Sequence, residues 1–212
     1  MKETTILIPA RRNSKGLPFK NRKLFHFTLN SIPEIYLDNV LVSTDDEWII
    51  KECEDNNVKY HIRKPETSDD LASTKSVIEE ISEKLRERVV MLYLTYPERT
   101  WENISDCLSF YEENNGKSLL CKKQLKTSPF LMMYDCGIKG KQIIEHNLYR
   151  RQDYPECFEI SHFISIFSKK ELKNLNNNLY NEDTIFYSID DVVDIDLIQD
   201  LEEYNEKNKN NS

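Results

Sequence analysis

Residues 8–25 read IPARRNSKGLPFKNRKLF, and they overlap the end of the first apolar run of the chain, TTILIP. That run is rich in β-branched residues, so we expect a buried strand that ends where the loop begins. The loop gathers cations in a chain whose formal net charge is -8, namely Arg11, Arg12, Lys15, Lys20, Arg22 and Lys23. Gly16 and Ser14 are small and allow a tight turn with several backbone N–H groups pointing into one concavity. The stretch therefore predicts a phosphate site.

A solvated basic loop is the alternative interpretation of the same residues. The loop lacks both the GxxxxGK[ST] and the GxGxxG patterns, so neither of these phosphate motifs identifies it. Its position directly after a core strand favours the phosphate site, because α/β sheets bind ligands outside the carboxyl ends of their strands. The loops after Ile8, Val42, Ile62 and Leu94 are the places where we expect functional residues.

Strand-like apolar runs alternate with helical periods along the rest of the chain. The expected strands are 39–44, 58–62, 89–95, 118–122, 163–167 and 184–189, and the expected helices are 47–53, 77–85, 101–111 and 197–206. Asp45 or Asp46 is a suitable N-cap for the first of these helices. The alternation predicts an α/β fold, with a mostly parallel twisted sheet flanked by helices. Periodicity weakens over residues 122–157, which are expected to form an arm.

Composition narrows the classes of protein. A length of 212 residues suits a single domain over 1–206 with a polar tail at 207–212. No apolar stretch approaches the length of a membrane span, and an acidic chain is a poor nucleic-acid binder. The cysteines form no CxxC pair, which predicts reduced thiols in the cytoplasm; they are Cys53, Cys107, Cys121, Cys136 and Cys157.

Six segments, taken in order, resemble the acylneuraminate cytidylyltransferases, the family of CMP-sugar-acid synthetases. IPARRNSKGLPFKN is similar to the family's amino-terminal signature, and VSTDDEWI to its V-S-T-D segment. RKPETSDDLAST, LYLTYPERT, RRQDYPECF and VDIDLIQDLEEYN resemble its later motifs. The resemblance spans essentially the whole chain. It implies a nucleotide-diphospho-sugar-transferase-like, Rossmann-like fold, a projecting dimerisation arm, and transfer of CMP from CTP to the anomeric hydroxyl of a 2-keto sugar acid, with release of pyrophosphate.

The resemblance also implies roles for individual residues on the nucleotide side. Arg11 and Lys20 would grip the triphosphate as catalytic residues, and Ser14, Lys15 and Asn21 would complete the cradle. The cytosine would be bordered by the backbone of Pro9 and Ala10, together with Arg63, Ala72 and Ser73. Phosphoryl-type transfer depends on positioning and charge neutralisation, which suits this set of cations. A surface arginine paired with Asp69 or Asp70 is the alternative for Arg63.

Asp194 and Asp196 form the expected metal site. Residues two apart in an extended segment point the same way, so both carboxylates would face one site while Ile195 faces the core. Paired carboxylates suit Mg²⁺, the implied cofactor, and Asp196 would be catalytic through it. The alternative makes Asp196 the N-cap of the last helix. Asp190, Asp191 and Asp200 are nearby substitutes if the register differs.

The sugar side departs from the family pattern. Tyr93 stands where the family has glutamine, Tyr96 where it has serine, and Ser161 and His162 where it has Asn-Gly. Arg151 is placed to pair with the sugar carboxylate. The segment between Asn21 and Val42 is shorter than in the family and places Pro33 inside an expected helix.

Two interpretations follow from this contrast. In the first, a cytoplasmic homodimeric enzyme, without nucleic-acid or membrane partners, uses CTP and a nonulosonic acid, with PFLMMY in the arm as an apolar contact. In the second, a degenerate member binds nucleotide or dimerises without catalysis. A KDO-type cytidylyltransferase is a further enzymatic alternative. The retained cations and aspartates favour an enzyme.

Overall fold

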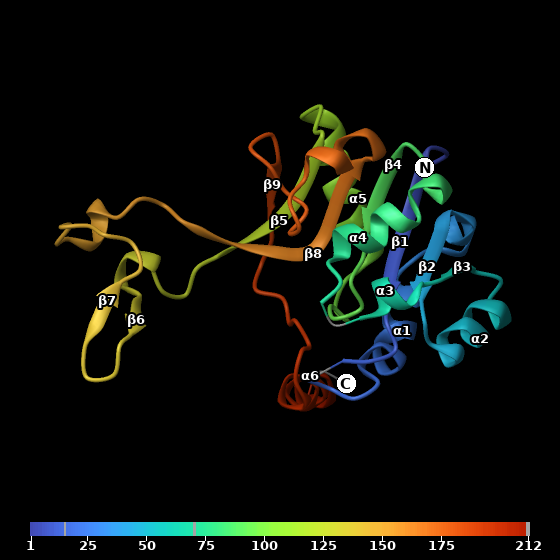
Figure 1. Ribbon diagram of the computed structural model, residues 1–212, viewed down its shortest axis with the longest axis horizontal. Coiled ribbons are helices and arrows are strands. Elements are labelled where there is room, and N and C mark those ends of the chain that lie inside the picture. Colours follow the sequence, from blue (N-terminus) through green and yellow to red (C-terminus); the bar gives the residue numbers. More distant parts are fainter. Residues whose placement is uncertain (15, 70, 211–212) are drawn as a thin grey trace.

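The computed structural model describes residues 1–14, 16–69 and 71–210 and contains a seven-stranded sheet in the order β3-β2-β1-β4-β8-β5-β9 (Figure 1). The strands are β1 (Thr4–Ala10), β2 (Val40–Thr44), β3 (Lys59–Ile62), β4 (Arg88–Met91), β5 (Ser118–Gln124), β8 (Phe158–Ser168) and β9 (Ile185–Ser188). Six of these run parallel to one another, and β8 lies antiparallel between β4 and β5. The expected α/β fold with a mostly parallel sheet is confirmed.

Helices cover both faces of the sheet, as Figure 1 shows. They are α1 (Lys20–Asn30), α2 (Glu47–Asp55), α3 (Pro65–Ser68), α4 (Thr74–Glu80), α5 (Trp101–Glu113) and α6 (Ile198–Asn210), with 3-10 turns η1 (Glu34–Asn39), η2 (Ser82–Lys84), η3 (Pro129–Leu131), η4 (Arg151–Asp153) and η5 (Lys169–Asn174). On β1, Ile6 and Ile8 pack into one apolar cluster and Leu7 into the other. The first cluster contains residues of α1, α2 and α5, and the second contains residues of α4 and η5. Alternation along a strand thus places two cores on opposite faces.

Polar side chains fix the starts of the helices. The side chain of Asp46, the expected N-cap of α2, accepts a hydrogen bond from the Trp48 amide at 2.9 Å. Thr100 and Asn103 form a reciprocal capping box at the start of α5. These caps satisfy amides that have no partner inside the helix.

Several expected boundaries were wrong. Pro33 lies outside any α-helix, because α1 ends at Asn30 and Pro33 instead precedes η1. The helix expected over 77–85 ends at Glu80 and continues as the turn η2, and β4 ends at Met91 rather than at Thr95. Helix α6 runs to Asn210, so residues 207–210 of the expected tail are helical, while 211–212 lie outside the described residues. The ends of helices and strands depend on where their backbone hydrogen bonds stop, and residue propensity alone does not determine this.

Residues 125–157, called the arm below, leave the sheet between β5 and β8 and project far from it (Figure 1). Their tip carries a two-stranded antiparallel hairpin, β6 (Met133–Asp135) and β7 (Gly140–Gln142). The expected segment 122–157 began three residues earlier, but those residues continue β5. The arm exposes large apolar side chains, among them Leu131, Met133 and Tyr134. Such a surface is unusual for a segment that lies alone in solvent.

The cysteine and membrane expectations can also be compared with the structure. All five cysteines are free thiols, and Cys53, Cys107 and Cys121 are buried. Within the described residues, none of the helices combines the length and the apolar character needed to cross a bilayer.

Candidate active site

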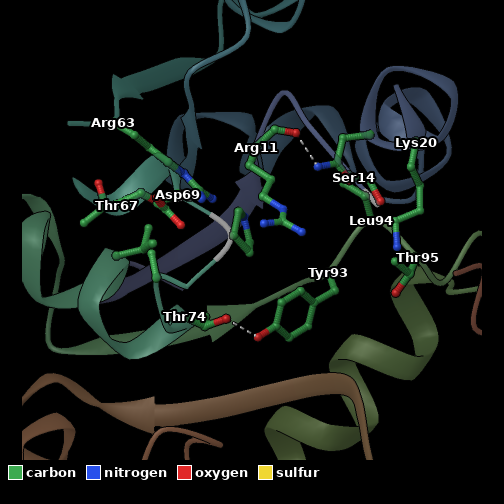
Figure 2. A pocket seen from close by; sticks show the side chains of 14 residues that line it. Arg11, Ser14, Lys20, Arg63, Thr67, Asp69, Thr74, Tyr93, Leu94 and Thr95 are labelled. Carbon is green, nitrogen blue, oxygen red and sulfur yellow. Dashed lines mark hydrogen bonds between the residues drawn. The ribbon is translucent and has the colours of Figure 1, made fainter. Parts of the chain in front are cut away.

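A pocket of about 290 Å³ opens where the chain leaves β1 and β4 (Figure 2). These strands are neighbours, but the chain continues from β1 to β2 on one side and reaches β4 from β3 by crossing the sheet. The point between them is a topological switch point, where open α/β sheets bind ligands. The pocket is lined by Pro9, Arg11, Ser14, Lys20, Asn21, Arg63, Thr67, Asp69, Ala72, Thr74, Val77, Tyr93, Leu94 and Thr95.

The basic loop is fixed at both ends by hydrogen bonds. The Asn21 side chain donates to the carbonyl of Arg11 at 2.7 Å, and the Arg12 amide donates to Asp45 Oδ1 at 2.7 Å. Helix α1 begins at Lys20, so its positive N-terminal end lies at the pocket beside the Lys20 ammonium. The pocket therefore has a cationic wall built from one short stretch of sequence.

Gly16 lies directly against the carboxyl-terminal part of the chain. A Cβ at Gly16 would collide with the backbone oxygen of Asp196 and would lie 3.1 Å from Leu197 Cδ2. The basic loop and the Asp196 segment are therefore in contact, and Lys20 Nζ donates to Asp196 Oδ1 at 2.6 Å. Glycine is needed here for this close approach, in addition to any role in turning the chain.

Arg63 enters the pocket from the end of β3 and is only 9% exposed. Burial lowers its pKa to about 10; Asp45 opposes this and the nearby Arg11 contributes to it, so the guanidinium stays charged at neutral pH. Arg63 Nε donates to the Ser43 carbonyl at 3.1 Å, and Nη1 donates to the Thr67 carbonyl at 3.4 Å. The alternative of a surface arginine is wrong for Arg63. Asp70 lies outside the described residues.

The acidic segment combines two exposed carboxylates with a buried residue between them. Ile195 is fully buried, and its amide donates to the Thr95 carbonyl at 2.8 Å, which fixes the segment beside the pocket. Asp194 Oδ2 accepts from the Tyr96 hydroxyl at 2.8 Å, and Asp196 pairs with Lys20. Asp200, in the first turn of α6, accepts at Oδ2 from the amides of Asp196 and Leu197, which precede the helix. The Asp196 carboxylate itself pairs with Lys20.

Asp194 and Asp196 can supply part of the coordination shell of a magnesium ion. No group of three or more metal-ligating side chains occurs within residues 1–14, 16–69 and 71–210. Asp194 and Asp196 supply hard oxygen ligands, and Mg²⁺ is commonly held by one or two carboxylates together with phosphate oxygens and water. The two aspartates are therefore sufficient only if a phosphate ligand completes the coordination.

Four of the five residues expected on the sugar side, Tyr93, Tyr96, Ser161 and His162, form one group beside the pocket, and Arg151 does not belong to it. The Tyr93 hydroxyl donates to Thr74 Oγ1 at 2.7 Å, a bond that Figure 2 shows across one side of the pocket. The His162 ring packs edge-on against Tyr93, with 5.6 Å between ring centroids. Burial lowers the pKa of His162 although Asp194 opposes this, so the ring is neutral at pH 7. Tyr96 is buried beside Ser161 and Asp194, and burial raises its pKa, so its hydroxyl remains a donor.

Some expected site residues do not line the pocket. Ala10 is buried in the core, and the Ser73 side chain caps α4 by accepting from the Ser76 amide. Arg151 lies on η4 of the arm, where it borders a separate groove with Lys126 and Tyr154. Lys15 lies outside the described residues.

The sequence analysis did not predict six of the residues that line the pocket. One is Asp69, which was considered only as an ion-pair partner of Arg63, and five others were not considered at all. These are Thr67, Thr74, Val77, Leu94 and Thr95. Leu94 and Thr95 belong to the loop that follows β4, which the expected sheet topology had already marked. Thr74 and Val77 come from the first turn of α4, and only the path of the chain between β3 and α4 reveals them.

The fold and the pocket define a doubly wound α/β protein with a cationic ligand site at its switch point. The profile of the cytidylyltransferase family matches residues 5–205. The chain belongs to the cytidylyltransferase family.

Two curated relatives illustrate the similarity in sequence. The chain is 27% identical over 177 residues to the N-acylneuraminate cytidylyltransferase of Streptococcus agalactiae serotype III, covering 77% of this chain and 43% of that protein. It is 30% identical over 207 residues to N-acylneuraminate cytidylyltransferase B of Danio rerio, covering 90% of this chain and 48% of that protein. The chain thus spans less than half the length of these relatives.

Solved structures show the same fold at low sequence identity. A CMP:2-keto-3-deoxy-manno-octonic acid synthetase complexed with CTP superposes with a TM-score of 0.71 at 12% identity, covering 99% of this chain and 100% of that one. The 4-diphosphocytidyl-2C-methyl-D-erythritol synthase of Anaerococcus prevotii gives a TM-score of 0.66 at 14% identity, covering 98% and 99%. At these identities the likeness is one of fold.

Proposed function

We propose that this protein transfers CMP from CTP to the anomeric hydroxyl of a sialic-acid-like 2-keto sugar acid and releases pyrophosphate. One observation carries the proposal: the cationic loop and the acidic segment meet in one place, with Lys20 Nζ 2.6 Å from Asp196 Oδ1. A triphosphate and a divalent ion require this combination of opposite charges at a single site. The five free cysteines support the proposal of a cytoplasmic enzyme.

Each charged residue has a distinct part in this reaction. Arg11 and Lys20 bind the triphosphate and neutralise charge as pyrophosphate leaves, with Ser14 and Asn21 shaping the loop. Arg63 lies on the other side of the pocket from Lys20, with Arg11 between (Figure 2 labels the three cations). Arg63 binds the cytosine together with Ala72, which also lines the pocket. This arrangement holds the nucleotide extended between two cationic ends.

Asp194 and Asp196 would hold the magnesium ion together with the phosphates. When bound, the ion polarises the attacked phosphate and screens the leaving pyrophosphate. The Tyr96 hydroxyl occupies one oxygen of Asp194 and orients that carboxylate. The ion pair with Lys20 keeps Asp196 beside the basic loop.

Sugar specificity depends on Tyr93, which lines the pocket, and on His162 of β8, whose ring packs edge-on against Tyr93. The alternatives are an eight-carbon octulosonate as substrate, or a nucleotide-binding protein without catalysis. The Tyr93–Thr74 hydrogen bond narrows the access for a sugar. It therefore favours the second alternative, a nucleotide-binding protein without catalysis.

The deciding experiment is a pyrophosphate-release assay with CTP, Mg²⁺ and a panel of nonulosonic and octulosonic acids. Release with a nine-carbon acid supports the proposal, and release only with an octulosonate selects the KDO-type alternative. Firm CTP binding without release from any acid identifies a binding protein.

Arg11→Ala is expected to weaken CTP binding by about tenfold or more, since charge-assisted hydrogen bonds contribute about 1.5–3 kcal/mol. Arg12→Ala is the matched control, because Arg12 is exposed and donates to Asp45 through its backbone amide, which alanine keeps. Isothermal titration with CTP should show less than about a threefold change for this control. Equal losses in the two variants would contradict the assignment of Arg11.

The arm is proposed to form a homodimer. Sedimentation velocity at micromolar concentration should show a dimer, and Met133→Glu should shift it toward monomer, because Met133 is part of the exposed apolar surface of the arm. Lys139→Glu, a charge change at the tip of the same hairpin, is the control. A monomeric wild-type protein would contradict the proposal.

A further inference from the structure

Glu80, the last residue of α4, is a buried carboxylate outside the pocket that the proposed reaction does not use. Its side chain is only 5% exposed. It accepts hydrogen bonds from the Lys64 amide at 3.1 Å and from the Thr67 hydroxyl. Burial opposes ionisation of Glu80, but these two bonds, together with the nearby His61 and Lys64, hold the pKa of its carboxyl below the usual value. Glu80 therefore carries a negative charge and fixes the loop that follows β3.

A second contact joins Glu80 to His61 on β3. His61 Nε2 lies 3.2 Å from Glu80 Oε1, and His61 Nδ1 lies 3.4 Å from Ser43 Oγ. Burial lowers the pKa of His61, although Glu80 opposes this, so the ring carries a single proton at neutral pH. A carboxylate only accepts hydrogen bonds, which assigns that proton to Nε2. Nδ1 is then an acceptor for the Ser43 hydroxyl.

The Ser43 hydroxyl completes the connection to the pocket. Ser43 Oγ is fully buried and accepts from Arg63 Nε at 3.2 Å. The donors therefore point in one direction, from Arg63 to Ser43, from Ser43 to His61, and from His61 to Glu80. A chain of aligned donors strengthens each of its members and permits one orientation of every group. Arg63 is thus oriented by a carboxylate that it does not touch.

We propose that Glu80 is a positioning residue for the nucleobase end of the pocket, which it controls through the orientation of Arg63 and the placement of the loop that contains Thr67. The inference rests on the proposed function, because Arg63 is taken to bind the cytosine. Glu80 has two routes to the pocket, since Thr67 both lines the pocket and donates to Glu80. Glu80 should therefore govern CTP affinity and the choice of base, and leave the rate of the chemical step nearly unchanged.

The test compares Glu80→Gln with Glu79→Gln. Both remove a carboxylate from neighbouring positions of α4, but the Glu79 side chain is 54% exposed and faces Lys75 at 3.9 Å. Glutamine at 80 keeps the length of the side chain but replaces one acceptor oxygen with an NH2 donor, so either the Thr67 hydroxyl or the pair formed by His61 Nε2 and the Lys64 amide meets a donor in place of an acceptor. We expect Glu80→Gln to raise the Kd for CTP about tenfold, with less than a twofold change in Glu79→Gln.

Base discrimination separates positioning from general loosening of the fold. Loss of stability would weaken CTP and UTP binding alike. A displaced Arg63 should instead lower the ratio of the Kd for UTP to the Kd for CTP, because the preference for cytosine is lost. In steady-state kinetics, KM for CTP should rise in Glu80→Gln while kcat changes less than about twofold. Thr67→Val, which removes one donor to Glu80, provides the same comparison if Glu80→Gln does not fold.

The possible results distinguish this inference from the proposed function. Suppose that the wild type binds CTP, and that the Glu80→Gln and Thr67→Val variants have the same Kd for CTP and the same ratio of the Kd for UTP to the Kd for CTP. The positioning role is then wrong and the proposed function stands. A larger fall in kcat than rise in KM would also overturn it. If the wild type does not bind CTP, the proposed function fails, and the inference fails with it.

Discussion

Replacing Asp196 with asparagine should lower turnover about 100-fold or more while CTP affinity changes only a few-fold. Under the proposed function, the substitution removes a charged metal ligand at the α-phosphate, and losses of about 10²–10³ are typical when one electrostatic stabiliser is removed from an active site. Asp196 is 67% exposed and its partner Lys20 remains in place, so the fold should tolerate the change. Pyrophosphate release and CTP titration measure the two effects separately.

Asp190→Asn is the matched control for this experiment. Asp190 is an exposed carboxylate a few positions earlier, before the segment that packs against Thr95. Its turnover should match the wild type. Full activity of Asp196→Asn, or a loss confined to Asp190→Asn, would show that the metal assignment is wrong.

Arg99→Met should lower the free energy of unfolding by about 3 kcal/mol, since each unsatisfied buried polar group costs about 1–3 kcal/mol. Arg99 is buried and donates to the carbonyls of Phe163 and Tyr93 and to the Thr28 hydroxyl, at 2.8–3.0 Å. Methionine retains much of the volume but leaves these acceptors without a donor. Burial lowers the pKa of Arg99 to about 9, so the guanidinium is charged at pH 7, where urea unfolding should be measured.

Lys170→Ala serves as the control for Arg99→Met. Lys170 pairs with Glu87 at 3.8 Å on the surface, with the lysine side chain 85% exposed. Exposed pairs contribute about 0–1 kcal/mol, so the midpoint of unfolding should hardly move. A loss in Arg99→Met as small as in this control would refute the structural role given to Arg99.

The sequence was sufficient for the fold class because its signals are local. The strand before the basic loop, the Asp46 cap and the apolar period of α5 each depend on neighbouring residues. The antiparallel direction of β8 and the ends of β4 and α4 depend on partners far along the chain. Local propensity cannot encode those partners.

The same distinction applies to the candidate site. Pattern and resemblance identified Arg11, Lys20 and Arg63, and the structure places all three around one pocket. They could not identify Glu80, because an isolated glutamate at the end of a helix resembles a solvated surface residue until its burial is known. They also assigned Ser73 to the site, whereas its side chain is used to cap α4.

Lys20 and Asp196 are 176 positions apart in the chain, yet they form one ion pair. During synthesis, the sheet strands β1 to β9 precede position 196, so the acidic edge of the pocket can form only after the ribosome has passed that residue. Under the proposed function, partly folded states that lack this edge should bind magnesium and CTP poorly, and both ligands should shift the folding equilibrium toward the native state by mass action. CTP would then stabilise the segment that joins the two halves of its own site.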